Sequence, residues 1–72
     1  MQGKSEEEMQ QVIEDAYRNH YRKYRQALTK RQPYDQARHL GAMSIHKERL
    51  MNQYGYKEED LQRIRKEEQE KS

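Results

Sequence analysis

Three histidines, at positions 20, 39 and 46, are the residues best suited to metal binding or proton transfer in this chain. His39 and His46 are two turns apart on one predicted helix, so they lack the i, i+4 spacing of a helical metal site. His20 falls within an apolar stripe, where a lone histidine is usually a packed ring and less often a pH switch. The chain has no cysteine. We therefore expect no metal site, and we expect His39 and His46 on a solvated flank.

Lys47 is the residue closest to a nucleophile. A desolvated lysine can form covalent intermediates, but no general base, oxyanion site or glycine-rich loop accompanies this one. Packing of its methylenes with the ammonium in water is the simpler interpretation. An ion pair with an acidic residue of a partner chain is the alternative. The sequence thus predicts a non-enzymatic protein with no catalytic residue and no cofactor.

Positive charge is concentrated in residues 18–31, whose net charge is +6, against −4 for residues 1–17. Arginines beside an aromatic ring can contact phosphates and stack a base, which makes nucleic-acid binding an alternative function. The candidate face for it comprises Arg18, Tyr21, Arg22 and Arg25. Two observations weigh against this alternative. Glu14 lies four residues before Arg18, the preferred intrahelical pairing, and the whole chain carries only +2.

The change from negative charge in residues 1–17 to positive charge in residues 18–31 also bears on how helices pack. Two copies of residues 6–30 packed antiparallel would place each acidic half beside the basic half of its partner, whereas parallel packing would align like charges. This pattern favours an antiparallel homodimer. It is equally compatible with docking onto a second helix of the same chain.

Local signals predict an all-α chain, with helices at about 6–30, 34–54 and 57–70. Ser5 and Glu8 form a capping box, Pro33 separates the first two helices, and Gly55 is suited to a left-handed cap. We expect a helical hairpin plus a short third helix in one domain, 1–72, with frayed tails at 1–4 and 70–72. The first helix would bury Met9, Ile13, Ala16, His20, Tyr24 and Ala27, with Val12, Tyr17 and Leu28 widening the stripe. The second would bury Ala37, Leu40, Met43, Ser44, Leu50, Met51 and Tyr54.

The supply of core residues is small. Leu, Ile and Val number eight of 72 residues, about 11% against the ~20% that usually accompanies a self-sufficient core. A chain of this size buries only about 60% of its unfolded surface. We therefore expect self-association to complete the fold. No apolar run could span a bilayer and the first residues lack a signal-peptide core, so we expect a cytoplasmic protein without membrane contact.

The back of the second predicted helix offers a further surface, because apolar residues there lie away from its main stripe. An aliphatic centre with an arginine and tyrosine rim is typical of protein interfaces. The candidate partner face comprises Tyr34, Arg38, Ala42, Ile45 and Arg49. Together these patterns predict a homo-oligomeric helical module that binds or regulates an unknown protein.

Overall fold

The computed structural model describes residues 5–71, and this part of the chain folds into three α-helices without a β-strand. Helix α1 spans Glu6–Thr29, α2 spans Pro33–Tyr54 and α3 spans Glu58–Lys71. The all-α class predicted from the sequence is confirmed. Residues 1–4 and 72, predicted as frayed tails, lie outside the described part, whereas α3 remains helical through Lys71.

Helix α1 begins at the predicted capping box. The Ser5 hydroxyl accepts a hydrogen bond from the Glu8 backbone amide at 3.2 Å, which satisfies one of the free amides of the first turn. The helix ends at a turn in which Arg31 adopts a positive φ of 56°. The Gln32 amide then donates to the Ala27 carbonyl at 2.9 Å, the long backbone bond that closes many helix C-termini.

Helix α2 starts on Pro33, whose fixed φ suits the first helical turn, and ends at Gly55. Gly55 has a φ of 72°, in the left-handed region that favours glycine. This cap lets the Tyr56 amide donate to the Leu50 carbonyl at 3.0 Å. The chain then turns into α3, where the Asp60 carboxylate accepts from the Lys57 amide at 2.8 Å.

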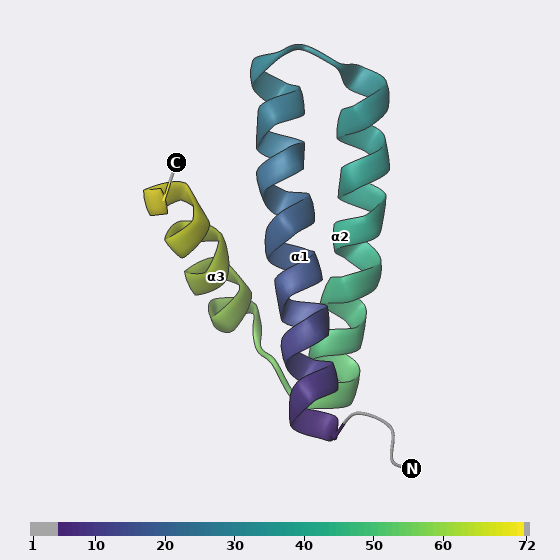
Figure 1. Cartoon of the computed structure of the whole chain (residues 1–72), viewed down its shortest axis with the longest axis vertical. Helices are drawn as coiled ribbons and strands as arrows, with labels where there is room; N and C mark the ends of the chain where they lie inside the picture. Colours follow the sequence, from purple (N-terminus) through teal and green to yellow (C-terminus); the bar gives the residue numbers. More distant parts are fainter. Residues whose placement is uncertain (1–4, 72) are drawn as a thin grey trace.

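Helix α1 lies between the other two helices, with α2 on one side and α3 on the other (Figure 1). Helices α1 and α2 run side by side in opposite directions, and α1 makes its most extensive contacts with α2. Helix α3 returns along α1 from the end near the N-terminus and covers only part of its length (Figure 1). No helix of residues 5–71 is long and apolar enough to cross a membrane.

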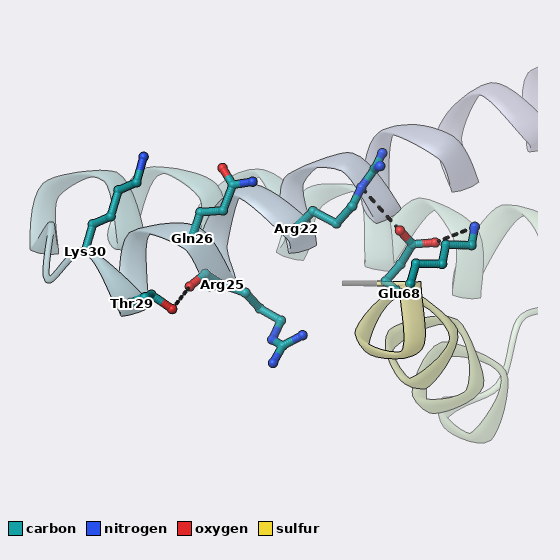
Figure 2. A pocket seen from close by; sticks show the side chains of 7 residues that line it. Arg22, Arg25, Gln26, Thr29, Lys30 and Glu68 are labelled. Atoms are coloured by element: carbon teal, nitrogen blue, oxygen red, sulfur yellow. Dashed lines mark hydrogen bonds and ion pairs between the residues drawn. The ribbon is translucent and has the colours of Figure 1, made fainter.

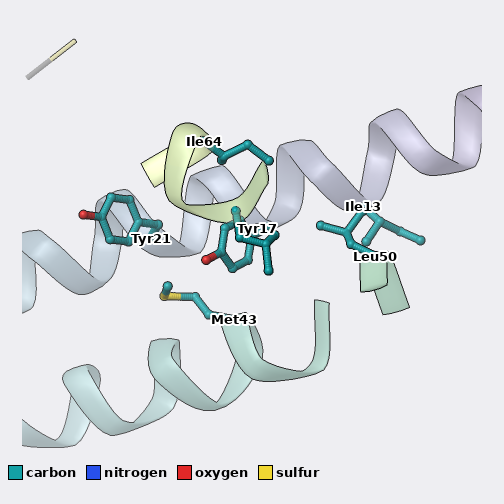
Figure 3. Packing of buried hydrophobic residues seen from close by; sticks show 7 residues of the cluster. Ile13, Tyr17, Tyr21, Met43, Leu50 and Ile64 are labelled. Carbon is teal, nitrogen blue, oxygen red and sulfur yellow. The ribbon is translucent and has the colours of Figure 1, made fainter. Parts of the chain in front are cut away.

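The hydrophobic core forms where all three helices meet. Tyr17 lies at its centre, between Ile64 of α3 and Met43 of α2 (Figure 3). Leu50 and Leu61 are fully buried in the same cluster. The core therefore includes residues of all three helices, with Leu61 and Ile64 contributed by α3.

Six positions differ from the predicted stripes, among them Ala37 and Ser44, which were placed in the buried stripe of α2 and are exposed. Tyr21, placed with the solvent-facing arginines, is only 7% exposed and belongs to the core. Val12, Leu28 and Leu40, placed in the stripes, are 43%, 46% and 47% exposed. For Tyr21, Leu28 and Leu40, the reason is the extent of α3. Helix α3 covers one face of α1 near Tyr17 and Tyr21 but ends before the far half of the hairpin.

Candidate functional site

Antiparallel packing of α1 against α2 brings all three histidines into one cluster. The Nδ1 atoms of His20 and His39 are 3.2 Å apart, within hydrogen-bond distance. The ring of His46 stacks on that of His20 at 5.5 Å between centroids, and His39 lies 5.4 Å from His20. His20 thus lies between two rings that are two turns apart on α2.

The expectation that His39 and His46 lie on a solvated flank is wrong. His39 is only 7% exposed. The Nδ1 atom of His46 is buried and has no hydrogen-bond partner among the described residues. The pattern of each helix taken alone does not predict this arrangement, because it depends on which turns of α2 face residue 20.

The surroundings of the cluster favour neutral imidazoles. Burial, followed by the nearby His46, His39, Lys23 and Arg38, lowers the pKa of His20 below its ordinary value. Burial and the positive charge of Arg49 lower the pKa of His46 in the same way. No group of three or more His, Cys, Asp or Glu side chains within residues 5–71 is placed to hold a metal ion.

A second polar site joins α3 to α1 through Arg18. Its guanidinium contacts Glu67 and Glu68 of α3 and Glu14 of its own helix, each at 2.9 Å. Burial lowers the pKa of Arg18, but the hydrogen bonds to Glu68, Glu67 and Glu14 outweigh it and raise that pKa overall. Arg18 is therefore a structural cation held by three carboxylates.

Glu68 is the buried end of this network, with its side chain 2% exposed. Arg22 lies 3.2 Å from one carboxylate oxygen and Lys71 lies 3.2 Å from the other. Burial raises the pKa of Glu68, yet hydrogen bonds from Arg18 and Lys71 outweigh it and hold the pKa below its ordinary value. Glu68 consequently stays ionised at neutral pH.

The predicted nucleic-acid face is thus the surface on which α3 docks. Besides Arg18 and Arg22, it includes Tyr21, whose buried ring carries a hydroxyl that accepts from the Gln69 amide at 2.6 Å. The Arg25 guanidinium lies 6.0 Å from the centroid of the Tyr21 ring. Of its three arginines, Arg22 and Arg25 line a hollow at the surface.

This basic hollow, of about 390 Å³, lies beyond the end of α3 (Figure 2). Its lining comprises Arg22, Arg25, Gln26, Thr29, Lys30, Glu68 and Lys71. The lining comes from the C-terminal half of α1 and the last turn of α3 (Figure 2). Helix dipoles are negative at C-terminal ends and favour cations over bound anions. Glu68 adds a full negative charge. The basic side chains of the hollow therefore complement the negative helix ends, and the hollow is a poor site for an anion.

A second hollow, of about 360 Å³, is lined by tyrosines of α1 and by residues of α2 and α3. We call it the tyrosine groove. It is lined by Tyr17, Tyr21, Tyr24, Leu40, Met43, Ser44, Lys47, Glu58 and Arg65. Lys47 pairs with Glu58 at 3.3 Å across its edge. The ion pair considered for Lys47 therefore forms within the chain.

The predicted partner face lies on the side of α2 away from this groove, since Ile45 is about 140° around the helix from Leu40. Tyr34 and Ile45 are 77% and 61% exposed, Arg38 and Arg49 are exposed, and Ala42 is half-buried. The structure places these residues on one side of α2.

Comparison of the chain with protein-family models, curated proteins and solved structures finds no match. The functional interpretation therefore depends on the physical features of the three helices.

Proposed function

We propose that this chain is a non-enzymatic helical interaction module that acts in the cytoplasm as an antiparallel homodimer. The observation that carries the proposal is the half-exposed apolar surface of the tyrosine groove. Leu40 lies on its rim, and Leu28 lies one heptad beyond Tyr21, on the same face of α1. The described core holds only eight buried apolar side chains, so covering two more leucines would be a substantial gain for so small a domain.

Charge along α1 supports the antiparallel arrangement. Residues 5–17 carry five acidic side chains and no basic one, whereas residues 18–34 carry six basic side chains and no acidic one. Part of this pattern complements the helix dipole. A second copy lying antiparallel would also bring the acidic end of one α1 to the basic end of the other, which gives electrostatic complementarity. The tyrosine groove lies near the middle of α1 and α2, where a two-fold axis would pass.

We expect the wild-type protein at micromolar concentration to sediment above its chain mass of 8.9 kDa. Its thermal midpoint should rise with protein concentration, as mass action requires. The double variant Leu28→Ser/Leu40→Ser should stay helical and sediment as a monomer. Sedimentation equilibrium with far-UV circular dichroism checks both results.

Val12→Ser is the matched control for the groove, because Val12 is 43% exposed but lies outside it. This variant should keep the wild-type mass. A wild-type protein that remains at 8.9 kDa with a concentration-independent midpoint would contradict the homodimer. A double variant that still dimerises would move the interface to another face.

We further propose that the back of α2, comprising Tyr34, Arg38, Ala42, Ile45 and Arg49, contacts a second protein. Ile45→Glu should retain helicity and dimer mass, because the side chain is 61% exposed, but should lose capture of that protein by tagged chain. Val12→Glu introduces the same charge at another exposed aliphatic position, and this variant should still capture the second protein. Equal capture by both variants would show that the back face is inert.

Nucleic-acid association through Arg18–Arg31 is the alternative function. The engagement of Arg18 and Arg22 with Glu68, and the burial of Tyr21, weigh against it. An electrophoretic shift titration separates the two functions. Retardation that weakens steeply with salt would favour the alternative, and none at low salt would exclude it.

A further inference from the structure

The histidine cluster contributes nothing to the proposed interfaces, yet it occupies the contact between the two longest helices. A contact made of three titratable rings, one buried and two half-buried, is unusual in a chain whose core is apolar and tyrosine-rich. We propose that His20, His39 and His46 form a pH-sensitive lock, which holds α1 against α2 while the rings are neutral and loosens the hairpin in mildly acidic solution.

The chemistry of the His20–His39 bond requires at least one neutral ring. With Nδ1 facing Nδ1 at 3.2 Å, one ring must donate its N–H while the other accepts with a free lone pair. A proton added to the accepting Nδ1 abolishes the bond. A proton added to the Nε2 atom of the donating ring keeps the bond but places a cation in the contact. When both rings are protonated, two N–H groups face each other and no bond remains.

The groups around the cluster oppose protonation. Lys23 of α1 and Arg38 of α2 act on His20, and Arg49 of α2 acts on His46. Helix α3 packs on the face of α1 that carries Arg18, about 160° around the helix from His20. The Glu67 and Glu68 carboxylates, which pair with Arg18, therefore lie across α1 from the cluster. Glu58, at the start of α3, pairs with Lys47 of α2 at 3.3 Å.

The direction of the pH effect follows from the lowered pKa values of His20 and His46. The unfolded chain, in which both titrate at their ordinary values near 6.5, binds protons more readily than the folded chain below that pH. The contribution of the cluster to the free energy of unfolding is fully present above pH ~6.5. It is lost as the pH falls from there through the folded-state pKa values. Each unit of lowered pKa corresponds to about a ten-fold change in the unfolding equilibrium constant.

The test is urea unfolding of the whole protein between pH 7.5 and 5.5, above the range in which carboxylates titrate. We expect the wild-type unfolding constant to rise about ten-fold or more across this interval. In the double variant His20→Asn/His46→Gln it should change by less than half as much on a logarithmic scale. Equal pH dependence in wild type and variant would overturn the proposal.

Nuclear magnetic resonance titration of the wild-type imidazole protons keeps the test valid if the variant does not fold. His20 and His46 should titrate below pH 6.5, together with chemical-shift changes at the α1–α2 contact. Titration of His20 and His46 at their ordinary pKa without such changes would overturn the lock. Zinc added to chelator-treated protein at pH 7.5 should leave the thermal midpoint unchanged. A zinc-dependent rise that His20→Asn abolishes would overturn the lock in favour of a metal site.

Discussion

Leu50→Asp is expected to unfold the chain, whereas Leu40→Asp should leave it helical. Leu50 is fully buried in the cluster that joins the three helices. The substitution removes a buried leucine and places an unpaired carboxylate in an apolar site, with a combined cost of about 4 kcal/mol or more. A core of this size rarely supplies more than about 3–5 kcal/mol in total. The unfolded state should therefore predominate.

Leu40→Asp is the matched control, since it makes the same change at a position that is 47% exposed on the rim of the tyrosine groove. Its aspartate can remain in water, so the monomer should lose about 1 kcal/mol or less. Far-UV circular dichroism and urea unfolding at neutral pH distinguish the two variants. Equal loss of helicity would mean that Leu40 is buried by the fold itself and that the groove is not open.

Helix positions were predictable because their signals are local. Ser5 and Glu8 marked the start of α1, and Gly55 marked the end of α2 with the expected left-handed backbone. The predicted boundaries of 6–30, 34–54 and 57–70 differ by one residue or less from those of the structure. Each of these signals affects only the backbone a few residues away in the sequence, so no tertiary information was needed.

The faces of the helices were harder to assign, because a third helix decides which surface is covered. Arg18 and Tyr21 looked solvent-facing on the wheel of an isolated α1. Their partners, Glu68 and Gln69, lie 50 and 48 residues further along the chain. Nothing in the local pattern records that distant pairing, and a tyrosine beside arginines suits either a surface or a core.

The histidine cluster was missed for a different reason. His20, His39 and His46 had each been assigned from its own helix, and the spacing of His39 and His46 was considered only within α2. Their proximity depends on the register between α1 and α2, which is set by the tight turn at residues 30–32 and by packing of Leu50 and Met43. A helical-wheel comparison of both helices at all antiparallel registers would have shown this cluster as one of several options.

Arg18→Met is expected to release α3 from the hairpin while α1 and α2 remain paired. The methionine keeps much of the side-chain volume but removes the guanidinium that bonds Glu67 and Glu68. Glu68 is nearly inaccessible to water, and loss of its ion pair with Arg18, at 2.9 Å, should weaken docking of α3 by about 2–4 kcal/mol. Amide hydrogen exchange should show faster exchange throughout α3, with smaller changes in α2.

Arg63→Met is the control for loss of an arginine, because Arg63 is 63% exposed and its ion pairs, both at 3.9 Å, lie within α3. Pairs of this kind contribute little, so protection of α3 should stay at the wild-type level.

The acid dependence of α3 docking gives an independent check. The pKa of Glu68 is held below its ordinary value of 4.5, so its contribution is present above pH ~4.5 and is lost as the pH falls through the folded-state pKa. Wild-type α3 should thus detach at a lower pH than the one at which the histidine contact loosens. Simultaneous loss of both contacts at one pH would show that α3 and the hairpin unfold as a single unit, and that Arg18 has no separate role in docking α3.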